Sequence, residues 1–509
     1  MEMFEGLMFG FSVALTPMNL GLAFLGCMIG TVVGALPGLG PTNGVAVLIP
    51  VAFTMGLNPA SSLILLTCVY YGAMYGGRIS SIMLNIPGDE PAVMTTLDGH
   101  PMAKAGKAPE ALGISAVASF VGATLATLGL TVFAPILAQF ALRFGPAEYV
   151  ALFLMAFATI GGVTGANPAK TLIAACVGLA LGTVGLDPTV GVERYSFGNI
   201  HLFDGFEPIV ALVGLFAISE FLLFLERPAG APSDAVAVNR AFARMGEVLK
   251  TAPTMLRCSA VGFVAGVLPG AGASLGSFLS YVFEKRVSDR GTFGTGDPRG
   301  VAAPEAGNNA AAGGALVPML TLGVPGSGTT AIMLALLISL GISPGPLLFE
   351  QSPDLVWGLF AALFLANIVL LVLNLPLVGL FTRILALPTW FLLPFVVMVC
   401  FVGVYAINHS TFDLMVMTAF GVLGYLFRKL QISLVPVVLG LLLGDLMEQN
   451  LRRALSISGG DFSILFESPI ALVLYAFTAA MLVVAVIFSR RGGPSLGPAR
   501  ADKPSERGT

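Results

Sequence analysis

The chain has 509 residues, of which 56% are hydrophobic and 10% are charged, and its formal net charge is −3. A soluble protein of this length would need a more charged surface, so the composition indicates an integral membrane protein. No basic patch supports binding to nucleic acid. Apolar runs recur from Leu20 to Phe488. Because one crossing needs ~20 apolar residues, we expect an all-α polytopic fold of about 10–12 transmembrane helices.

The first unusual element is a helix-breaking phrase inside an apolar stretch, GALPGLGPTNG at Gly34–Gly44. A second such phrase, NIPG at Asn85–Gly88, follows it. Proline and glycine weaken or break a helix, so their presence in these stretches calls for a reason. The polar segment that follows, Asp98–Glu110, carries Lys104 and Lys107.

The longest polar stretch, Glu226–Arg257, carries five basic residues and contains the flexible phrase PAGAPSD. Basic loops concentrate on the cytoplasmic side of a membrane, so we interpret this stretch as a cytoplasmic linker. The predicted domains are a first membrane half (residues 1–225), the linker (226–257), a second membrane half with additional helices (258–488), and a polar tail (489–509) that we expect to be disordered.

The second half repeats both phrases, as GVLPGAGASLG at Gly266–Gly276 and as GVPG at Gly323–Gly326. Between residues 31–45 and residues 263–277, seven of fifteen positions are identical, and these include the whole of LPG. Chance similarity between apolar segments would not readily reproduce a pattern of Gly and Pro. The pattern therefore indicates an internal duplication.

The charged flanks indicate that the two halves have opposite orientations. No Lys or Arg precedes the first LPG phrase, whereas five basic residues precede the second. Lys104 and Lys107 follow the first PG phrase, whereas SPGPLLFEQSPD, which has no basic residue, follows the second. Opposite flanks at matched positions are expected of inverted-topology repeats.

Basic residues flank the second LPG phrase closely, with Arg257 before it and Lys285 and Arg286 after it. About a dozen residues lie on each side of Pro269, which is too few for two crossings. We therefore expect a re-entrant hairpin with LPGAG at its tip. The alternative is that Gly and Pro serve as tight helix-packing sites or as a kink, which is their usual meaning in membrane helices.

Breaks at matched places in two halves point to a binding site near the middle of the membrane. Backbone exposed there must line an enclosed cavity, where helix N-termini suit an anion and free carbonyl groups suit a cation. Small hydroxyl and amide side chains cluster around the breaks, although any one of them could be an interhelical contact. The predicted substrate-binding residues are Pro37, Gly38, Thr42, Asn43, Arg78, Ser80, Ser81, Asn85, Pro87, Gly88, Pro269, Gly270, Ser274, Asn308, Asn309, Pro325, Gly326, Ser327, Thr329 and Thr330, with Ser277 beside them.

Arg78 lies within an otherwise apolar stretch, YGGRISS. An arginine inside the membrane is costly and is a functional-site hypothesis by default, most simply as the partner of a substrate carboxylate. On this hypothesis Arg78→Ala weakens carboxylate affinity and leaves expression intact. The alternative is a snorkelling or internally paired arginine.

Three acidic residues are candidates for coupling to a cation or for a proton relay, namely Glu305, Asp413 and Asp445. For Glu305, a charge placed near a helix N-terminus after Pro304 is an equally good explanation. The segment DLMEQNLRRAL, which starts at Asp445, reads as a charged helix end at the membrane surface. The three histidines are scattered, so we expect no metal site and no cofactor beyond a co-transported Na⁺ or H⁺.

No motif for nucleotide hydrolysis, serine hydrolysis or zinc proteolysis occurs, so we expect a protein that is not an enzyme.

Several phrases together resemble the large membrane subunit of the tripartite tricarboxylate transporters, the TctA family. They are GALPGLGP, YYGAMYGGRISSIMLNIPGDEPAVMTTLDGHPMAKAGKA, FGPAEY, GVLPGAGASLGSFLSYVFEK, PEAGNNAAAGG, LTLGVPG, GISPGP and GDLMEQNLRRAL. They occur in the family's order from the N-terminus to about Pro469. The family motifs fall on the two LPG phrases, the two PG phrases, and Glu305, Asn308 and Asn309. Arg78 departs from the resemblance, because relatives have a small hydroxyl residue in the corresponding stretch.

The resemblance implies a permease of the bacterial inner membrane that works with a small membrane subunit (TctB-like) and a periplasmic solute-binding protein (TctC-like). The implied cargo is a tricarboxylate such as citrate, or a related dicarboxylate or aromatic carboxylate, driven by a gradient of Na⁺ or H⁺. A homodimer is possible. We expect alternating access by an elevator-like motion, which the sequence does not separate from rocking. A passive anion channel, or a structural or signalling membrane subunit, stays open as an alternative.

Overall fold

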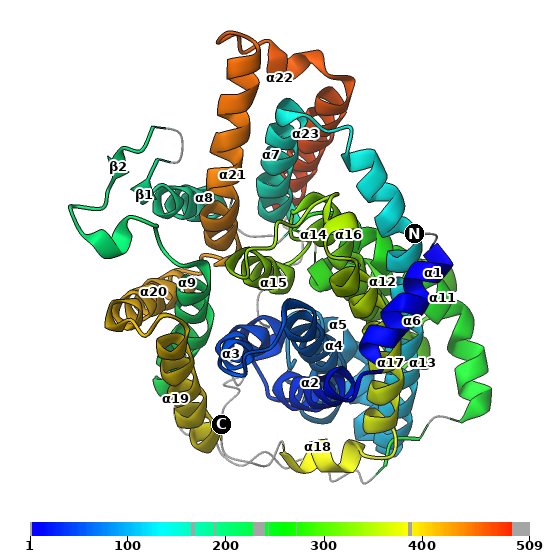
Figure 1. Ribbon diagram of the computed structural model, residues 1–509. Coiled ribbons are helices and arrows are strands. Elements are labelled where there is room, and N and C mark those ends of the chain that lie inside the picture. Colours follow the sequence, from blue (N-terminus) through cyan, green and yellow to red (C-terminus); the bar gives the residue numbers. More distant parts are fainter. Residues whose placement is uncertain are drawn as a thin grey trace, which may run out of the picture.

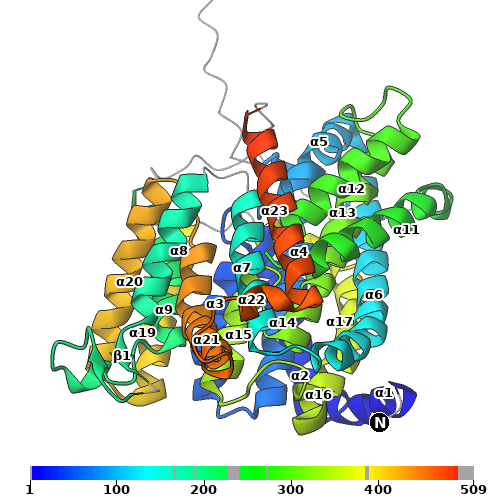
Figure 2. The same ribbon diagram turned by 90° about the horizontal axis from the view of Figure 1, so that it is seen from above.

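The computed structural model describes residues 3–163, 168–187, 190–226, 240–242, 244–270, 272–384 and 389–490. Residues 227–239 and 243 of the predicted linker, and all of the predicted polar tail after Arg490, lie outside these residues. The described residues are almost entirely helical, and the strands among them form one two-residue hairpin, β1 with β2. Many of the helices run in roughly the same direction in Figure 2, whereas α1, α11 and α22 lie across them.

The first half contains, in order, α1 (Met3–Ala14), α2 (Pro17–Ala35), α3 (Gly40–Thr54), α4 (Pro59–Leu84), α5 (Val93–Met102), η1 (Ala103–Lys107), α6 (Ala108–Ala141), α7 (Pro146–Val163), α8 (Pro168–Gly182), β1 (Gly185–Leu186), β2 (Glu193–Arg194), η2 (Ile200–Leu202), α9 (Pro208–Val213), η3 (Gly214–Ile218) and α10 (Ser219–Leu225).

The second half contains α11 (Met245–Val267), α12 (Gly272–Ser288), α13 (Pro298–Gly314), α14 (Leu316–Leu322), α15 (Gly328–Ser339), α16 (Leu348–Gln351), α17 (Pro353–Asn374), α18 (Val378–Ile384), α19 (Thr389–Asn408), α20 (Thr411–Lys429), α21 (Val435–Ile457), α22 (Ile464–Glu467) and α23 (Pro469–Arg490). The last part of the predicted linker, from Met245 to Arg257, forms the start of α11.

Five of the described helical segments are long and apolar enough to cross a membrane by themselves, and seven shorter apolar helices accompany them. The long segments are Pro17–Ala35, Val93–Ala141, Pro208–Leu225, Pro353–Asn374 and Thr411–Lys429. Together with the broken helices described below, they confirm an all-α polytopic membrane protein.

Helix α4 from the first half lies near the centre of Figure 1, and α13 from the second half lies beside α6. Nearly every residue of α4 between Ala60 and Met83 is buried, as is every residue of α13 from Gly300 to Gly314. A helix that is buried all round needs neighbours on every side. For α4 these include α2, α3 and α17, and for α13 they include α6, α11 and α12.

The two central helices pack in the same way. In α2, Gly34 lies so close to α4 that an added Cβ would clash with the Ala73 carbonyl oxygen. In α11, Gly266 lies against the Ala311 carbonyl of α13 in the same manner. Gly266 is the counterpart of Gly34 in the repeat, and Ala311 is the counterpart of Ala73. The internal duplication that the sequence predicts is therefore present in the helix packing, and glycine permits the close approach.

The basic segments gather at one end of the molecule. The Phe242 N–H, just before α11, donates to the Pro109 carbonyl 2.9 Å away, next to Lys104 and Lys107. The loop after α12 also lies at this end, beside α5, whereas α1 and the β1–β2 hairpin lie toward the opposite end (Figure 2). The positive-inside rule predicts that an end with such basic segments faces the cytoplasm.

Candidate functional site

The two LPG phrases form real breaks with matched backbone geometry. Helix α2 ends at an extended Leu36 (ψ 118°), and α11 ends at an extended Leu268 (ψ 122°). The glycine of each LPG is left-handed, with φ 84° at Gly38 and φ 77° at Gly270. Only glycine adopts this conformation without strain, which explains why both copies keep it. The predicted helix break at each LPG is thus confirmed. The alternative role of glycine, tight helix packing, applies to Gly34 and Gly266, which precede the breaks.

The two PG phrases also match in geometry. Helix α4 ends at Asn85 with φ 57°, and α14 ends at Gly323 with φ 67°, both left-handed. Each is followed by a non-helical PG segment before the next helix begins. Four helix breaks, two in each half, therefore interrupt the core.

Hydrogen bonds join the LPG break to the PG break within each half. The Gly38 N–H donates to the Gly88 carbonyl at 3.1 Å, and the Gly272 N–H donates to the Gly326 carbonyl at 3.0 Å. Each pair satisfies backbone groups that the breaks release, which a membrane interior requires.

Hydrogen bonds also cross between the halves. The Thr42 and Thr329 hydroxyls lie 2.9 Å apart, which joins the start of α3 to the start of α15. The Ser277 hydroxyl of α12 donates to the Pro91 carbonyl at 2.7 Å, just after the first PG phrase. With the two bonds within the halves, these contacts link all four breaks in a closed cycle. We call this arrangement the break ring.

The first crossing, which we call the first junction, brings two helix N-termini together. Thr42 is in the first turn of α3, and Thr329 is in the first turn of α15. Ser327 and Thr330 form a capping box at the start of α15. The Thr330 N–H donates to the Ser327 hydroxyl and the Ser327 N–H donates to the Thr330 hydroxyl, so both hydroxyls cap the helix. Free N–H groups and the positive ends of two dipoles suit an anion at this place.

An arginine that the sequence analysis did not single out reaches the first junction. Arg428, near the end of α20, donates to the Asn43 side-chain oxygen at 3.2 Å and pairs with Glu220. The Asn43 amide donates in turn to the Leu39 carbonyl of the first LPG break at 2.6 Å. In the sequence, Arg428 looks like an ordinary basic residue at a helix end; its contact with Asn43 separates it from Lys429, which pairs with Glu226.

The second crossing, which we call the second junction, is acidic. The Ser274 hydroxyl at the start of α12 lies 3.4 Å from a carboxylate oxygen of Glu90. Asp89, which precedes Glu90, is buried against Gly77 of α4 and Gly40 of the first LPG break. Neither acid was among the predicted cation residues, although both follow the first PG phrase directly. The signal that could have found them is two carboxylates placed at a break.

Arg78 lies away from any open surface, with 0% exposure, and its guanidinium group is bound by protein atoms. It donates to the Tyr75 and Leu112 carbonyls, to the Ser115 hydroxyl and to the Asn374 side-chain oxygen, at 2.5–3.0 Å. The structure therefore shows the internally paired alternative. Binding of a substrate carboxylate by Arg78 stays a prediction, and it would require the loss of these contacts.

Glu305 lies on α13 in a buried polar cluster. Its carboxylate accepts from the Thr95 hydroxyl at 2.5 Å and from the Ser119 hydroxyl at 3.0 Å. The Asn309 amide donates to the Asn308 side-chain oxygen and to the Glu305 carbonyl. The Asn308 amide nitrogen and the Asn309 amide oxygen are buried without a hydrogen-bond partner. Such unpaired polar atoms in a core are a mark of function, and the assignment of these three residues stays a prediction.

The other predicted acids lie outside the break ring. Asp413 is in the first turn of α20, where Asn408 donates to it, and Asp445 is exposed on α21, where Gln449 donates to it. Neither carboxylate hydrogen-bonds to a described residue of the breaks. Their role in cation coupling also stays a prediction.

The remaining predicted residues occupy supporting positions. The hydroxyls of Ser80 and Ser81 both donate to the Gly77 carbonyl, in the helical turn before them. Asn85 is exposed at the end of α4. The prolines of the breaks, Pro37, Pro87, Pro269 and Pro325, withhold N–H donors at the four places where the helices stop.

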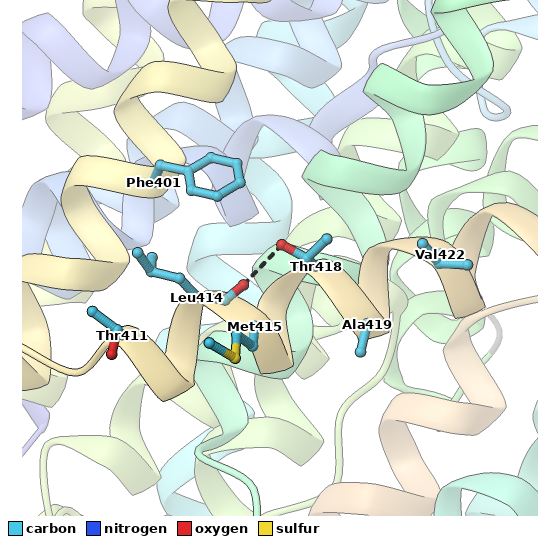
Figure 3. Close-up of a pocket in the computed structure, with 7 residues that line it drawn as sticks. All are labelled: Phe401, Thr411, Leu414, Met415, Thr418, Ala419 and Val422. Carbon is cyan, nitrogen blue, oxygen red and sulfur yellow. Dashed lines mark hydrogen bonds between the residues drawn. The ribbon is translucent and has the colours of Figure 1, made fainter.

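A groove on the surface of α20 has a mainly apolar lining, unlike the polar groups of the break ring. It runs along α20 beside Phe401 of α19 and is lined by Leu414, Met415, Ala419, Val422 and two threonines, Thr411 and Thr418 (Figure 3). The Thr418 hydroxyl is already used by the Leu414 carbonyl at 2.8 Å. A groove with this lining suits lipid chains and offers no group for a charged ligand.

Comparison with known proteins agrees with the arrangement. A family model described as the tripartite tricarboxylate transporter TctA family matches residues 20–439. An uncharacterized 52.8 kDa protein in the TAR-I ttuC′ 3′ region of Agrobacterium vitis is 39% identical over 492 residues, which is 96% of this chain and 98% of that protein.

A second Agrobacterium vitis protein, uncharacterized and in the TAR-II ttuC′ 3′ region, is 40% identical over 231 residues, which is 45% of this chain and 96% of that protein. No solved structure matches this chain. The family match spans both LPG breaks, both PG breaks and the PEAGNN segment. The chain therefore belongs to the tripartite tricarboxylate transporter TctA family.

Proposed function

We propose that the chain is the large permease subunit of a binding-protein-dependent secondary transporter that imports a carboxylate across the bacterial inner membrane. A gradient of Na⁺ or H⁺ drives the import. Membership in the family makes the chain a component of a tripartite transport system, and the proposal adds its direction, cargo and energy source.

The observation that carries the proposal is the first junction. Two helix N-termini from different halves meet there, with the Thr42 and Thr329 hydroxyls 2.9 Å apart. Arg428 donates a hydrogen bond to the side chain of Asn43, the residue that follows Thr42. N–H groups, hydroxyls and a guanidinium are the groups that bind a carboxylate, and here three elements supply them together.

The break ring also supplies a route to alternating access. At each junction one or two hydrogen bonds join the breaks of the two halves, and such contacts can exchange at a small cost. Elsewhere the two halves pack closely, as Gly122 of α6 does against the Ala306 carbonyl of α13. The mechanism that follows moves the paired breaks with bound carboxylate and cation against the remainder, in an elevator-like motion.

The partners in this proposal are a small TctB-like membrane subunit, a periplasmic TctC-like solute-binding protein and membrane lipid, and a homodimer of the large subunit is compatible with it. The substrate class is citrate and related tricarboxylates, with dicarboxylates and aromatic carboxylates as the next candidates. These choices rest on the family and on the anion-suited first junction.

The test is uptake of a panel of radiolabelled carboxylates into proteoliposomes that hold this chain and its small partner. The solute-binding protein and an inward Na⁺ or H⁺ gradient are each supplied or withheld. Uptake that needs the binding protein and one gradient supports the proposal and identifies the substrate. A verified reconstitution that takes up none of the panel contradicts the carboxylate assignment.

The same experiment separates the rival functions. A passive anion channel would equilibrate the substrate without any gradient or binding protein. A structural or signalling subunit would show no uptake, and substitution at Asn308 would then change no flux.

A further inference from the structure

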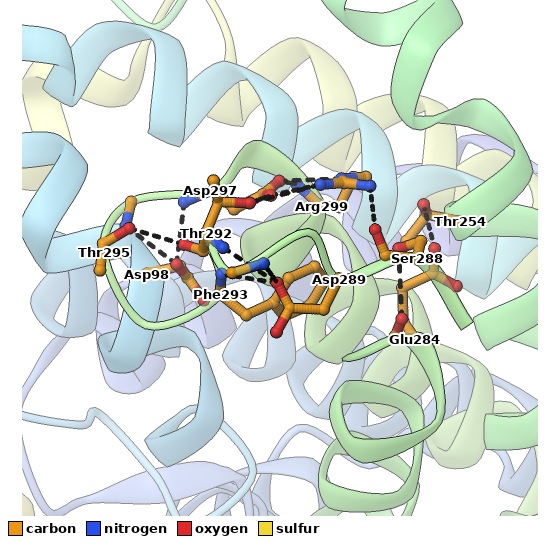
Figure 4. A network of polar contacts seen from close by, with 12 residues as sticks. Asp98, Thr254, Glu284, Ser288, Asp289, Thr292, Phe293, Thr295, Asp297 and Arg299 are labelled. Atoms are coloured by element: carbon orange, nitrogen blue, oxygen red, sulfur yellow. Dashed lines mark hydrogen bonds and ion pairs between the residues drawn. The ribbon is translucent and has the colours of Figure 1, made fainter. Parts of the chain in front are cut away.

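Buried carboxylates elsewhere in the molecule are fully provided with donors. Asp98 of α5 accepts from the N–H groups of Gly294, Gly296 and Asp297 at 2.8–2.9 Å and from the Tyr281 hydroxyl at 3.0 Å (Figure 4). A buried carboxylate without such donors costs several kcal/mol, by the usual order of magnitude. At Asp98, four hydrogen-bond donors thus compensate for the burial of a carboxylate that has a structural role.

Glu284 is satisfied in a second way, by pairing with a basic residue. Its carboxylate is 0% exposed, bonds Arg257 at 2.6 Å and accepts from the Thr254 hydroxyl at 2.8 Å (Figure 4 shows Glu284 and Thr254). Glu305 accepts from two hydroxyls and lies within Coulombic range of the buried Arg78. The positive charge of Arg78 offsets the negative charge of Glu305.

Asp89 has neither kind of compensation. It is 8% exposed, and one carboxylate oxygen accepts a single hydrogen bond, from the Ala92 N–H at 2.9 Å. The other oxygen is buried and has no hydrogen-bond partner. Among the residues that the structure describes, no Lys, Arg or His forms an ion pair with Asp89. Its negative charge therefore lacks a counter-charge from the chain itself.

Two glycines bring the backbone close to Asp89. An added Cβ at Gly77 would lie 2.9 Å from one Asp89 oxygen, so the carboxylate rests against bare helix backbone. Gly40 of the first LPG break lies against the Asp89 Cβ. Helix α4 ends at Leu84, so the negative end of its dipole lies in the same segment. These features favour a positive charge beside Asp89.

The charge count favours a monovalent ion. The described residues contain no group of three or more His, Cys, Asp or Glu side chains that could hold a metal. Divalent ions in proteins usually take several carboxylate ligands, whereas one carboxylate with neutral oxygens is sufficient for Na⁺. The Asp89 side chain supplies one charge and one buried oxygen that has no hydrogen-bond partner.

We propose that Asp89 is the coupling residue of this transporter and binds the co-transported cation, a sodium ion, beside the first PG break. The inference rests on the proposed function as a secondary transporter and places its cation at the second junction, apart from the carboxylate at the first. It replaces none of the residues predicted for substrate binding.

The test measures cation binding by the purified full-length chain, without substrate. Its melting temperature is recorded in rising NaCl, with choline chloride keeping the total salt constant. A ligand that binds the folded state raises the melting temperature in a saturable way. We expect a saturable rise for the wild type, and for Asp89→Asn a half-saturating Na⁺ concentration at least about tenfold higher, or no rise.

Two further variants make the result specific. Asp354→Asn makes the same chemical change at an exposed position in the first turn of α17, and it should keep the wild-type response. Asp89→Ser places at this position the residue type that the chain itself uses at the matched position of the second PG break, Ser327. It should also lose the response, which guards against a defect peculiar to asparagine.

Each outcome decides the matter. A wild-type Na⁺ response in folded Asp89→Asn and Asp89→Ser overturns the assignment. A wild type that ignores Na⁺ but whose stability depends on pH through Asp89 overturns sodium in favour of a proton. Carboxylate uptake in proteoliposomes is scored separately, so Na⁺ binding at Asp89 without uptake would sink the proposed cargo and leave this inference standing.

Discussion

Within each half the LPG break packs on the PG break in the same way, but the two junctions between the halves differ in their charged groups. Gly40 packs on Asp89 as Gly272 packs on Ser327, with 3.5 Å from the added Cβ to the neighbour's Cβ in both cases. At the first junction two hydroxyls meet at helix N-termini, whereas at the second a hydroxyl meets Glu90 beside Asp89. Duplication thus supplied two equivalent frames, and the side chains made one suited to an anion and the other to a cation.

The same divergence explains why the segments after the two PG phrases differ so much in polarity. Helix α15 is buried from Thr329 to Leu337 and has apolar neighbours. Helix α5 uses Asp98 to hold the loop between α12 and α13, and Thr95 to bind Glu305. The polar sequence after the first PG phrase is therefore needed for tertiary contacts that its counterpart does not make.

The largest expected effect comes from Arg78→Ala, which asks whether the buried arginine acts on substrate or on the fold. The change removes four hydrogen bonds and the positive charge near Glu305, and should cost about 3–5 kcal/mol of stability. We expect a large loss of folded protein, measured by size-exclusion chromatography of the detergent extract. Intact expression together with a raised KM for the carboxylate would restore the substrate-binding hypothesis.

The equivalence of the two halves is tested by Gly34→Ala and Gly266→Ala. Each added methyl group would meet a backbone carbonyl, of Ala73 or of Ala311, which cannot move aside. Overpacking of this kind costs about 1–3 kcal/mol or more, and we expect both variants to lose similar amounts of thermal stability.

Gly21→Ala, on the same helix as Gly34, is the matched control. An added Cβ there meets nothing within 4 Å, and alanine favours a helix over glycine, so stability should stay the same or rise. If Gly34→Ala is harmful and Gly266→Ala is neutral, the two halves do not pack equivalently.

Thr42→Val tests the difference between the first and second junctions, because it keeps the side-chain shape and removes the hydroxyl. One hydrogen bond to a ligand or neighbour is worth about 1 kcal/mol, so we expect KM for the carboxylate to rise several-fold with an unchanged Na⁺ response. Ser274→Ala should change the KM less, because its contact to Glu90 is long. Equal effects of both variants on carboxylate KM would remove the distinction between the junctions.

The smallest effect concerns the loop that supports the second junction from the basic end. Burial alone would raise the pKa of Asp297, but hydrogen bonds from Arg299 and Thr292 outweigh it and hold the pKa below its usual range. The stabilisation is therefore present above the unfolded-state pKa and is lost as the pH falls through the lower folded-state pKa.

Because Arg299, which pairs with the buried Asp297, is 25% exposed and solvent screens the pair, the contribution of Asp297 should stay within about 1 kcal/mol. Wild type and Asp297→Asn should differ in melting temperature at neutral pH and converge as the pH falls through the acid range. A difference that persists unchanged in acid would show that the charge of Asp297 is not responsible.

Much of the fold could be predicted because it is written in local patterns. Apolar length gave the membrane helices, and LPG and PG gave the four breaks, of which three turn left-handed at glycine and one at Asn85. The duplication was visible for a similar reason, since glycine is favoured where the chain turns left-handed or two backbones touch. Arg78 was less predictable, because an intramembrane arginine has the same appearance in the sequence whether its partner is a ligand or Leu112, Ser115 and Asn374.

The sequence by itself determined the solvent, the helices, the breaks and the family, because composition, helix-breaking residues and motif order are properties of the chain. The tertiary structure alone decided that the breaks close into a ring, that Arg428 reaches Asn43, and that Asp89 is buried with one hydrogen bond. These facts depend on which residues from distant segments become neighbours. A charge becomes costly or useful only when folding has removed its water and chosen its partners.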